Sequence, residues 1–133
     1  MRILHQRITI IKIRKPSQRD VNEELQWLGD SLGLFNERDK DKSCFRIFIE
    51  LLKSTRAHRP VSSDEIAYKL GLSRGTVMHH INKLIDAGIV IVEQGKYILR
   101  VDHLEQLIDE LEKDIQRACD DLRTIARDID ENI

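Results

Sequence analysis

The stretch Ser62–Val92 constrains the fold of this chain more than any other part of its sequence. It opens with the Ser-x-x-Glu pattern of a helical capping box, in which Ser62 and Glu65 satisfy amides that the first turn leaves free. A helix is therefore predicted to begin there. Gly71 should end it, because glycine adopts the left-handed conformation of a helix C-terminus at little cost.

A second helix is predicted to follow after a three-residue turn. Ser73 is a good N-cap for it, because a serine oxygen accepts hydrogen bonds from the free amides of a first turn. Val77, Ile81 and Leu84 recur at helical spacing and predict a buried stripe. Gly88 marks the end of this helix.

Two β-branched runs, 89–93 and 96–101, come next and flank Gln94-Gly95, which is a strong signal for a tight hairpin. Two short helices followed by such a hairpin have the layout of a helix-turn-helix with a wing. The second helix of that layout can enter a DNA major groove. The predicted fold class is mainly α with a small β-hairpin wing, a winged helix-turn-helix plus a long C-terminal helix.

The face of the second helix opposite its apolar stripe is polar and basic. Arg74, His79 and Asn82 could offer hydrogen-bonding groups to base edges. Lys83 and Lys96 are expected to touch phosphate instead. The predicted DNA-binding residues are Ser73, Arg74, Gly75, Thr76, His79, Asn82, Lys83 and Lys96.

The run Leu72–Val90, Leu-Ser-Arg-Gly-Thr-Val-x-His-His-x-x-Lys-Leu-x-x-x-Gly-Ile-Val, resembles the recognition helix and first wing strand of ArsR-like winged helix-turn-helix regulators of archaea and bacteria. The resemblance covers residues 43–101 and implies a homodimeric transcription factor. The chain departs from the metal-sensing members, because it lacks their cysteine pair and Asp102-His103 is not followed by a second ligand pair. No metal and no cofactor are therefore expected. The DNA-facing positions that the resemblance carries over are Ser73, Arg74, Thr76, His79 and Lys83.

The last segment carries an unbroken heptad pattern of apolar residues, which favours a two-stranded coiled coil. So long a stripe needs a partner beyond a small winged domain, most simply a second copy. Leu107, Cys119 and Ala126 widen the stripe, so a helical bundle or a helix that folds back on its own chain stays possible. The acids of this segment are expected to form a solvated face. The predicted dimerisation residues are Leu104, Ile108, Leu111, Ile115, Ala118, Leu122, Ile125 and Ile129.

The segment before the winged region predicts a basic arm and one helix. Met1–Arg19 carries six Arg or Lys and no acid, which suggests phosphate contacts. The β-branched residues of 8–14 predict a strand, and that strand could pair across a dimer. The sequence leaves these two roles open. Asp20 and Glu23 should begin a helix that Gly33 ends.

Three regions follow from these patterns: 1–35, an arm, strand and helix; 36–101, the winged domain; and 102–133, the dimerisation helix. The net charge is only -1, but it is unevenly distributed, with eleven acids against four bases in 102–133. Such segregation is compatible with DNA binding. The hydrophobic content of 41% and the charged content of 34% describe a soluble globular protein.

No enzyme is expected, because the sequence shows no Gly-rich phosphate loop, nucleophile elbow or metal-ligand spacing. With no convincing signal peptide and no apolar stretch of membrane-spanning length, a cytoplasmic protein with two buried, reduced cysteines is expected. The predicted function is a homodimeric, sequence-specific DNA-binding transcriptional regulator. The alternative is a winged-helix module for protein assembly in a transcription or chromosome-associated complex. The outer face of the second helix argues against it, because only Met78 there is apolar.

Overall fold

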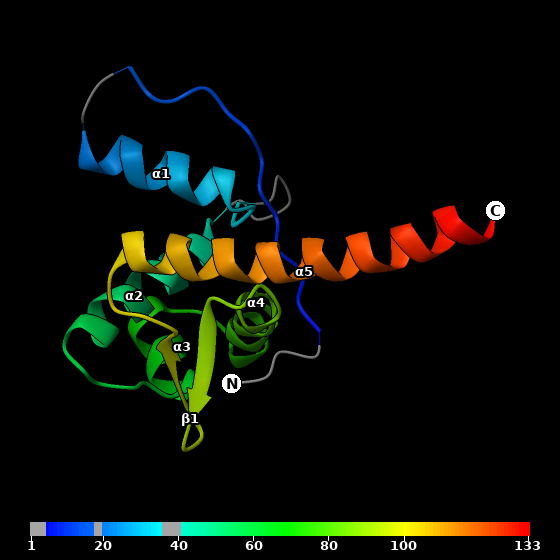
Figure 1. Cartoon of the computed structure of the whole chain (residues 1–133). Coiled ribbons are helices and arrows are strands. Elements are labelled where there is room, and N and C mark those ends of the chain that lie inside the picture. The colour runs from blue at the N-terminus through cyan, green and yellow to red at the C-terminus, as the bar shows by residue number, and fades with distance from the viewer. Residues whose placement is uncertain (1–4, 18–19, 36–40) are drawn as a thin grey trace.

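The computed structural model describes residues 5–17, 20–35 and 41–133. These residues form a mainly helical structure with one antiparallel hairpin and a long last helix, which confirms the predicted fold class (Figure 1). The elements are α1 (Val21–Ser31), α2 (Ser43–Arg56), α3 (Ser63–Leu70), α4 (Arg74–Asp86), β1 (Val90–Glu93), β2 (Lys96–Leu99) and α5 (Leu104–Asn132).

The helix-turn-helix begins and ends at the predicted capping residues. The Ser62 hydroxyl oxygen accepts a hydrogen bond from the backbone amide of Glu65 at 3.1 Å and so starts α3. Gly71, with φ of 67°, ends α3 in the left-handed conformation. The Ser73 hydroxyl accepts from the amide of Thr76 at 3.1 Å and starts α4. The turn between the helices is therefore fixed by local side-chain chemistry.

The wing is a two-stranded hairpin in which β1 pairs with β2 from Val90 opposite Leu99 to Glu93 opposite Lys96. Gln94 and Gly95 both have positive φ, as a two-residue turn of the type that matches strand twist requires. A further bridge joins Tyr97 to Val61, so the hairpin is anchored to the chain just before α3. The strands are slightly shorter than the sequence predicts.

The core lies where α2, α3 and α4 meet beneath the hairpin. Phe48 and Leu51 of α2 are fully buried, and so is the predicted stripe of α4, Val77, Ile81 and Leu84. The fully buried face of α2 also contains Cys44 and Ile47, whereas Phe45 and Ile49 of the same helix are only half-buried.

The predicted strand at 8–14 is wrong, because residues 5–17 form neither strand nor helix. This segment, which we call the arm, runs past the end of α4 and on toward α1 (Figure 1). Its backbone pairs with helix ends instead of a sheet: the amide of Arg7 donates to the Asp86 carbonyl at 2.8 Å, and that of Ile11 donates to the Ser31 carbonyl at 2.7 Å. Of the β-branched side chains that suggested a strand, Ile10, Ile11 and Ile13 are exposed and Ile8 is half-buried.

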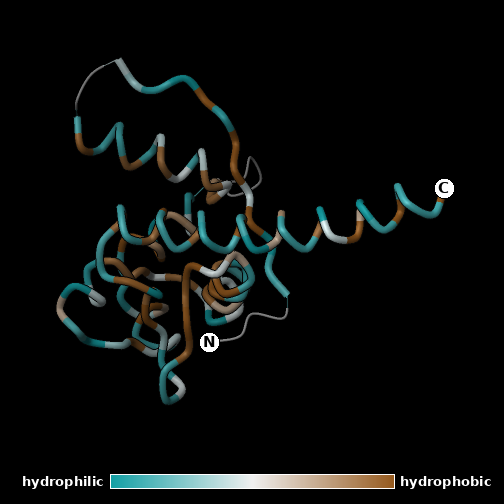
Figure 2. The backbone as a smooth tube through the Cα atoms, in the orientation of Figure 1, coloured by the Kyte–Doolittle hydropathy of each residue, from teal (hydrophilic) through white to brown (hydrophobic). Residues whose placement is uncertain are grey.

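The two halves of α5 have different surroundings. Leu107 and Leu111 are buried against the winged region, whereas residues 116–132, which we call the overhang, project away from it (Figure 1). Figure 2 shows apolar positions recurring along the overhang. Leu107, which appeared only to widen the stripe, is the most buried residue of this helix. Leu111, a predicted seam residue, packs within its own chain instead.

Of the two cysteines, Cys44 is buried as expected, but Cys119 on α5 is only half-buried. None of the helices in the described ranges has the length and apolar content needed to cross a membrane.

Candidate nucleic-acid interface

The outer face of α4 is presented to solvent because the opposite face is pinned to α2 and α3 by its buried stripe. Thr76 is half-buried at the start of the helix. The other predicted residues of this helix and its cap are all exposed: Ser73, Arg74, Gly75, His79, Asn82 and Lys83. The structure therefore places the predicted polar face of α4 on the surface as one continuous strip.

The first turn of α4 is organised by its own hydroxyls. Besides capping the helix, Ser73 donates its hydroxyl hydrogen to Thr76 Oγ1 at 2.8 Å. These two side chains thus fix the first turn, where free amides and the helix dipole favour an anion. Gly75 adds no bulk there: a Cβ atom at this position would meet nothing within 4 Å, so the surface stays open to an approaching molecule.

Arg74 has a partner that the sequence analysis missed. Its Nε lies 3.5 Å from Oδ1 of Asp64 in the first turn of α3, and both side chains are about three-quarters exposed, at 76% and 74%. An ion pair so exposed contributes only about 0–1 kcal/mol. Arg74 can therefore exchange Asp64 for a stronger acceptor at a small cost in free energy. Until then, Asp64 holds the Arg74 side chain near the first turn of α4.

The wing covers the one apolar residue of the outer face. The Tyr97 hydroxyl of β2 lies 3.7 Å from the sulfur of Met78, which is half-buried. Lys96 is exposed at the tip of the hairpin, but Glu93 lies opposite it in the register and reduces the positive charge there. With Met78 partly covered, the face that remains exposed on α4 is polar.

A groove of about 530 Å³ separates the arm from the C-terminal half of α4. We call it the arm groove. Three predicted DNA-binding residues, His79, Asn82 and Lys83, line one wall, whereas the remaining predicted residues lie outside it. No pattern in the sequence indicates that the arm lies beside α4. The other lining residues are His5, Arg7, Thr9, Leu32, Gly33, Leu34, Asp86 and Ala87.

A buried carboxylate holds the arm in place. Gln6 donates its side-chain amide to the Ala87 carbonyl at 3.1 Å and to Oδ2 of Asp114 at 2.8 Å. Arg100, which follows β2, donates to both oxygens of Asp114, and Arg117 donates to Oδ1. Asp114 is therefore not part of a solvated face, as the sequence analysis expected of the acids in this segment. It links the arm, the wing and α5.

The electrostatics of this cluster follow from its contacts. Burial acts to raise the pKa of Asp114, but hydrogen bonds from Arg100, Gln6 and Arg117 outweigh burial and hold that pKa below its ordinary value. The same hydrogen bond to Asp114 raises the pKa of the Arg100 guanidinium. Both groups therefore stay charged at neutral pH.

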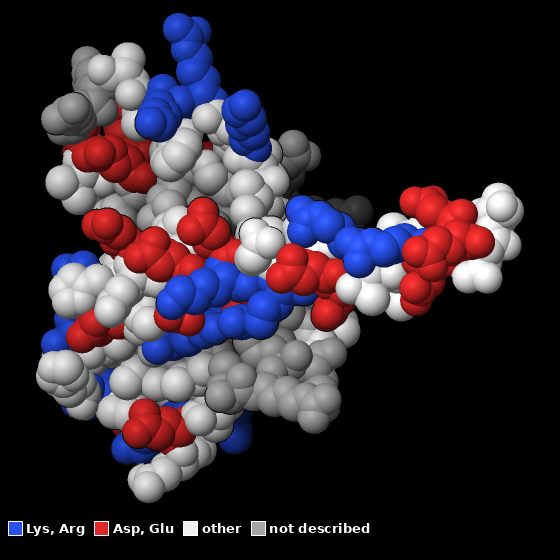
Figure 3. All heavy atoms as spheres, viewed as in Figure 1, with Lys and Arg blue, Asp and Glu red and all other residues white. Residues whose placement is uncertain are grey.

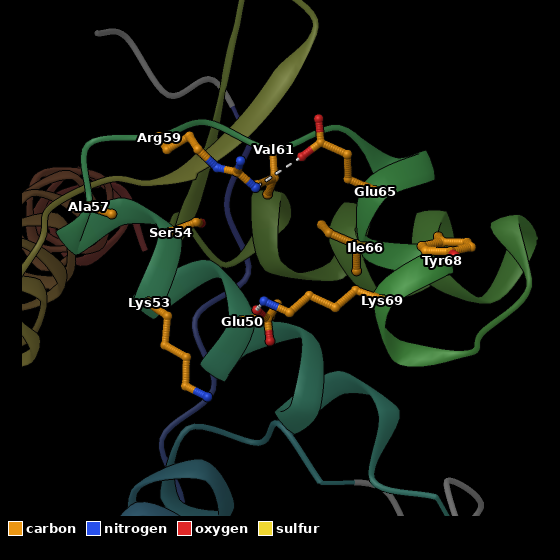
Figure 4. A pocket seen from close by; sticks show the side chains of 10 residues that line it. All are labelled: Glu50, Lys53, Ser54, Ala57, Arg59, Val61, Glu65, Ile66, Tyr68 and Lys69. Atoms are coloured by element: carbon orange, nitrogen blue, oxygen red, sulfur yellow. Dashed lines mark ion pairs between the residues drawn. The ribbon is translucent and has the colours of Figure 1, made fainter.

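A second hollow, of about 510 Å³, lies between α2 and α3 (Figure 4). Two of its three bases are paired with acids: Lys69 Nζ lies 2.5 Å from Oε1 of Glu50, and Arg59 lies 3.5 Å from Glu65. Tyr68 at its rim is 93% exposed. None of the sequence-predicted site residues lines this hollow, so it is separate from the α4 face.

The distribution of charge on the rest of the surface matches the predicted basic arm, but the predicted acidic face of the last helix is interrupted by basic side chains (Figure 3). Figure 3 shows basic side chains at the upper bend of the arm, while acidic and basic side chains mix along α5. Several of these acids pair with bases one helical turn away, as Asp120 does with Arg123 at 3.2 Å. No group of three or more metal-binding side chains is found in 5–17, 20–35 and 41–133.

Residues 41–93 match the family model of a helix-turn-helix domain. The match spans α2, α3, α4 and β1, and leaves the arm, α1, β2 and α5 outside it. No curated protein and no solved structure shows significant similarity to the chain. A helix-turn-helix is typical of DNA-binding transcriptional regulators, which place the second helix of the motif in the major groove. The helix at that position of the motif is α4.

Proposed function

We propose that this chain is a homodimeric, sequence-specific transcriptional regulator of the ArsR-like winged helix-turn-helix type. The observation that carries the proposal is the outer face of α4, which is exposed, polar and basic, in the helix that a helix-turn-helix presents to DNA. A protein-binding surface of similar position would more often expose aliphatic or aromatic side chains. Here the wing partly covers the only apolar side chain, Met78.

Sequence would be read chiefly by the N-terminal half of α4. Arg74 projects from the first turn and can form two hydrogen bonds to guanine, the commonest specific contact in the major groove. His79 and Asn82 follow along the exposed strip and can reach adjacent base edges. Lys83 lies one helical turn beyond His79, and Lys96 lies on the wing. Both are suited to phosphate because lysine acts as a point charge.

The dimer is supported by the overhang of α5. Leu122, Ile125 and Ile129 are 69%, 58% and 50% exposed, although they continue the apolar pattern that buries Leu107 and Leu111 nearer the domain. Residues 116–132 extend about 25 Å as a helix, long enough for a second copy to pack along them. A two-fold dimer would place its two α4 helices in successive major grooves of a palindromic site.

The decisive experiment selects bound fragments from genomic DNA and compares two matched variants on the enriched sequence. Arg74→Ala should lose about 1–3 kcal/mol of binding free energy, or roughly 5- to 150-fold in affinity, and relax base selectivity. Arg123→Ala is the control, because it removes an equally charged surface residue that also pairs with one aspartate. Equal losses in both variants would contradict base reading by Arg74.

A protein-assembly role has one observation in its favour, the 93% exposed Tyr68 beside the hollow of Figure 4. Assembly rather than DNA binding would be indicated if the unmodified protein enriched no duplex fragment at low salt. Tyr68→Ser should leave DNA affinity unchanged under our proposal, because Tyr68 lines a hollow to which none of the predicted DNA-binding residues contributes.

A further inference from the structure

We propose that the arm groove seats a backbone phosphate of the duplex that α4 reads, and that Arg7 of the arm grips it together with His5 and Lys83. The inference rests on the proposed DNA binding and extends it, since it adds a DNA-contacting element outside the helix-turn-helix match of residues 41–93.

The side chains that line the arm groove favour an anion. Arg7 and Lys83 bring two positive charges against Asp86, the only acid among its described lining residues, and the rings of His5 and His79 can donate hydrogen bonds. In the hollow between α2 and α3, by contrast, two of the three bases, Lys69 and Arg59, pair with carboxylates. No such ion pair involves Arg7 or Lys83 within the described part of the chain. Their charges are therefore available to a ligand.

The arm is fixed in position before any ligand arrives. The backbone amide of Arg7 donates to the Asp86 carbonyl at 2.8 Å, and Gln6 on its other side bonds Ala87 and Asp114. A Cβ atom at Gly88 would lie 2.2 Å from Nε2 of Gln6, so glycine at this position permits the close approach. Because its backbone is already ordered, Arg7 can bind phosphate at a smaller entropic cost than a residue in a free tail.

The position of the groove identifies its occupant as duplex DNA. His79, Asn82 and Lys83 belong both to the groove wall and to the exposed strip of α4. A duplex lying on that strip therefore passes the mouth of the groove, and each of its strands brings a phosphate about every 3.4 Å of helix axis. Hydrogen bonds to phosphate of this kind fix the register of a protein on DNA without reading its sequence.

The test measures the affinity of the full chain for a mixed-sequence duplex across a range of salt concentrations. Arg7→Ala should reduce the slope of log affinity against log salt by about 0.9, the value for one lost phosphate contact. The substitution keeps the backbone amide that bonds Asp86. Arg14→Ala is the matched control, because it removes the same charge from the same arm but lies outside the groove. Its slope should stay within error of the unmodified protein.

Equal slopes for the Arg7→Ala and Arg14→Ala proteins would overturn the inference. So would a result in which inorganic phosphate shifts the NMR signals of His5 and Arg7 while Arg7→Ala leaves duplex affinity unchanged, because the groove would then hold a small anion. In either case the unmodified protein would still bind duplex and Arg74→Ala would still lose selectivity, so the proposed function would stand. Failure of the unmodified protein to bind any duplex would overturn both proposals.

Discussion

The two halves of α5 carry the same apolar pattern but meet different surroundings. In the first half Leu107 and Leu111 are 1% and 4% exposed, whereas Leu122 and Ile125 in the overhang are 69% and 58% exposed. Full burial of a leucine or isoleucine contributes about 1.5–3 kcal/mol, so the first half stabilises the fold and the overhang lacks that contribution in a single chain. A helical pattern thus identifies the face that needs a partner and leaves the partner itself undetermined.

The largest effect on stability is expected from a substitution in the first half of α5, which packs against the winged region and which we call the docked half. Leu107→Ala should lower the free energy of unfolding by about 2–5 kcal/mol, because it removes buried atoms and leaves a cavity in a packed core. Urea unfolding followed by circular dichroism measures this change. Leu122→Ala is the matched control and should change the unfolding free energy by no more than about 0.5 kcal/mol at concentrations where the chain is monomeric. Equal losses in both variants would erase the distinction between the halves.

An intermediate effect is expected at the end of the docked half, where Asp114 ties α5 to the arm and wing. Asp114→Asn should lower the free energy of unfolding by about 1–3 kcal/mol at neutral pH, because Arg100, whose side chain is only 14% exposed, loses its charged acceptor. Thermal unfolding at a series of pH values measures it. Gln116→Ala on the exposed side of the same helix serves as the control.

The pH dependence of this effect has a definite sign. The pKa of Asp114 is lower in the folded protein than its ordinary value of 3.8, so the stabilisation is fully present above that value. It is lost as pH falls through the folded pKa. The difference between the unmodified protein and Asp114→Asn should therefore shrink below about pH 4. A difference that grew on acidification would contradict the assigned ion pair.

A substitution in the overhang is expected to change the stability of the fold least. Its effect should appear instead in the molecular mass, which reports whether the protein is a dimer. Leu122→Asp should barely change the unfolding of a dilute chain, because its side chain already lies in water. The same change should abolish the proposed dimer, since it buries a charge without a counter-charge in an apolar seam. Light scattering at micromolar concentration measures this loss. Leu122 is a better site than the half-buried Ile115, whose substitution also disturbs the domain. A monomeric unmodified protein would contradict the dimer.

The elements that the sequence predicted well are those with local causes. Ser62, Gly71 and Ser73 act within a few residues, so their caps appear in the structure as predicted. The strand at 8–14 was predicted wrongly because β-branched residues favour extended backbone, but only pairing with a neighbouring strand edge makes a strand. The arm does not pair with the hairpin, and the Ile11 amide bonds the end of α1 instead. The role of Gln6 as an anchor of the arm could not be predicted either, because its partner Asp114 lies 108 residues away in the sequence.

The candidate site divides in the same way. The helical period predicted that Arg74, His79 and Asn82 would be exposed on one face, and the structure places them there. The ion pair of Arg74 with Asp64, the covering of Met78 by Tyr97 and the arm groove depend on how separate elements pack. Periodicity within one helix contains no information about such contacts. Asp64, an acid in the first turn of α3, was the only sequence signal for any of these contacts, because it could have suggested the ion pair with Arg74.

The long separation between the arm and its anchors has a consequence for the order of events during synthesis. The ribosome makes the arm before every other element, yet Gln6 contacts Ala87 and Asp114, 81 and 108 residues later. The helices and hairpin of 43–99 can form most of their contacts earlier, because these contacts join segments closer in sequence. The arm is thus made before the elements that it contacts, and it gains its last anchor only when Asp114 has been made. A nascent chain stalled before Asp114 would lack the hydrogen bond from Gln6 to Asp114 and would hold the arm through its contacts with the ends of α1 and α4.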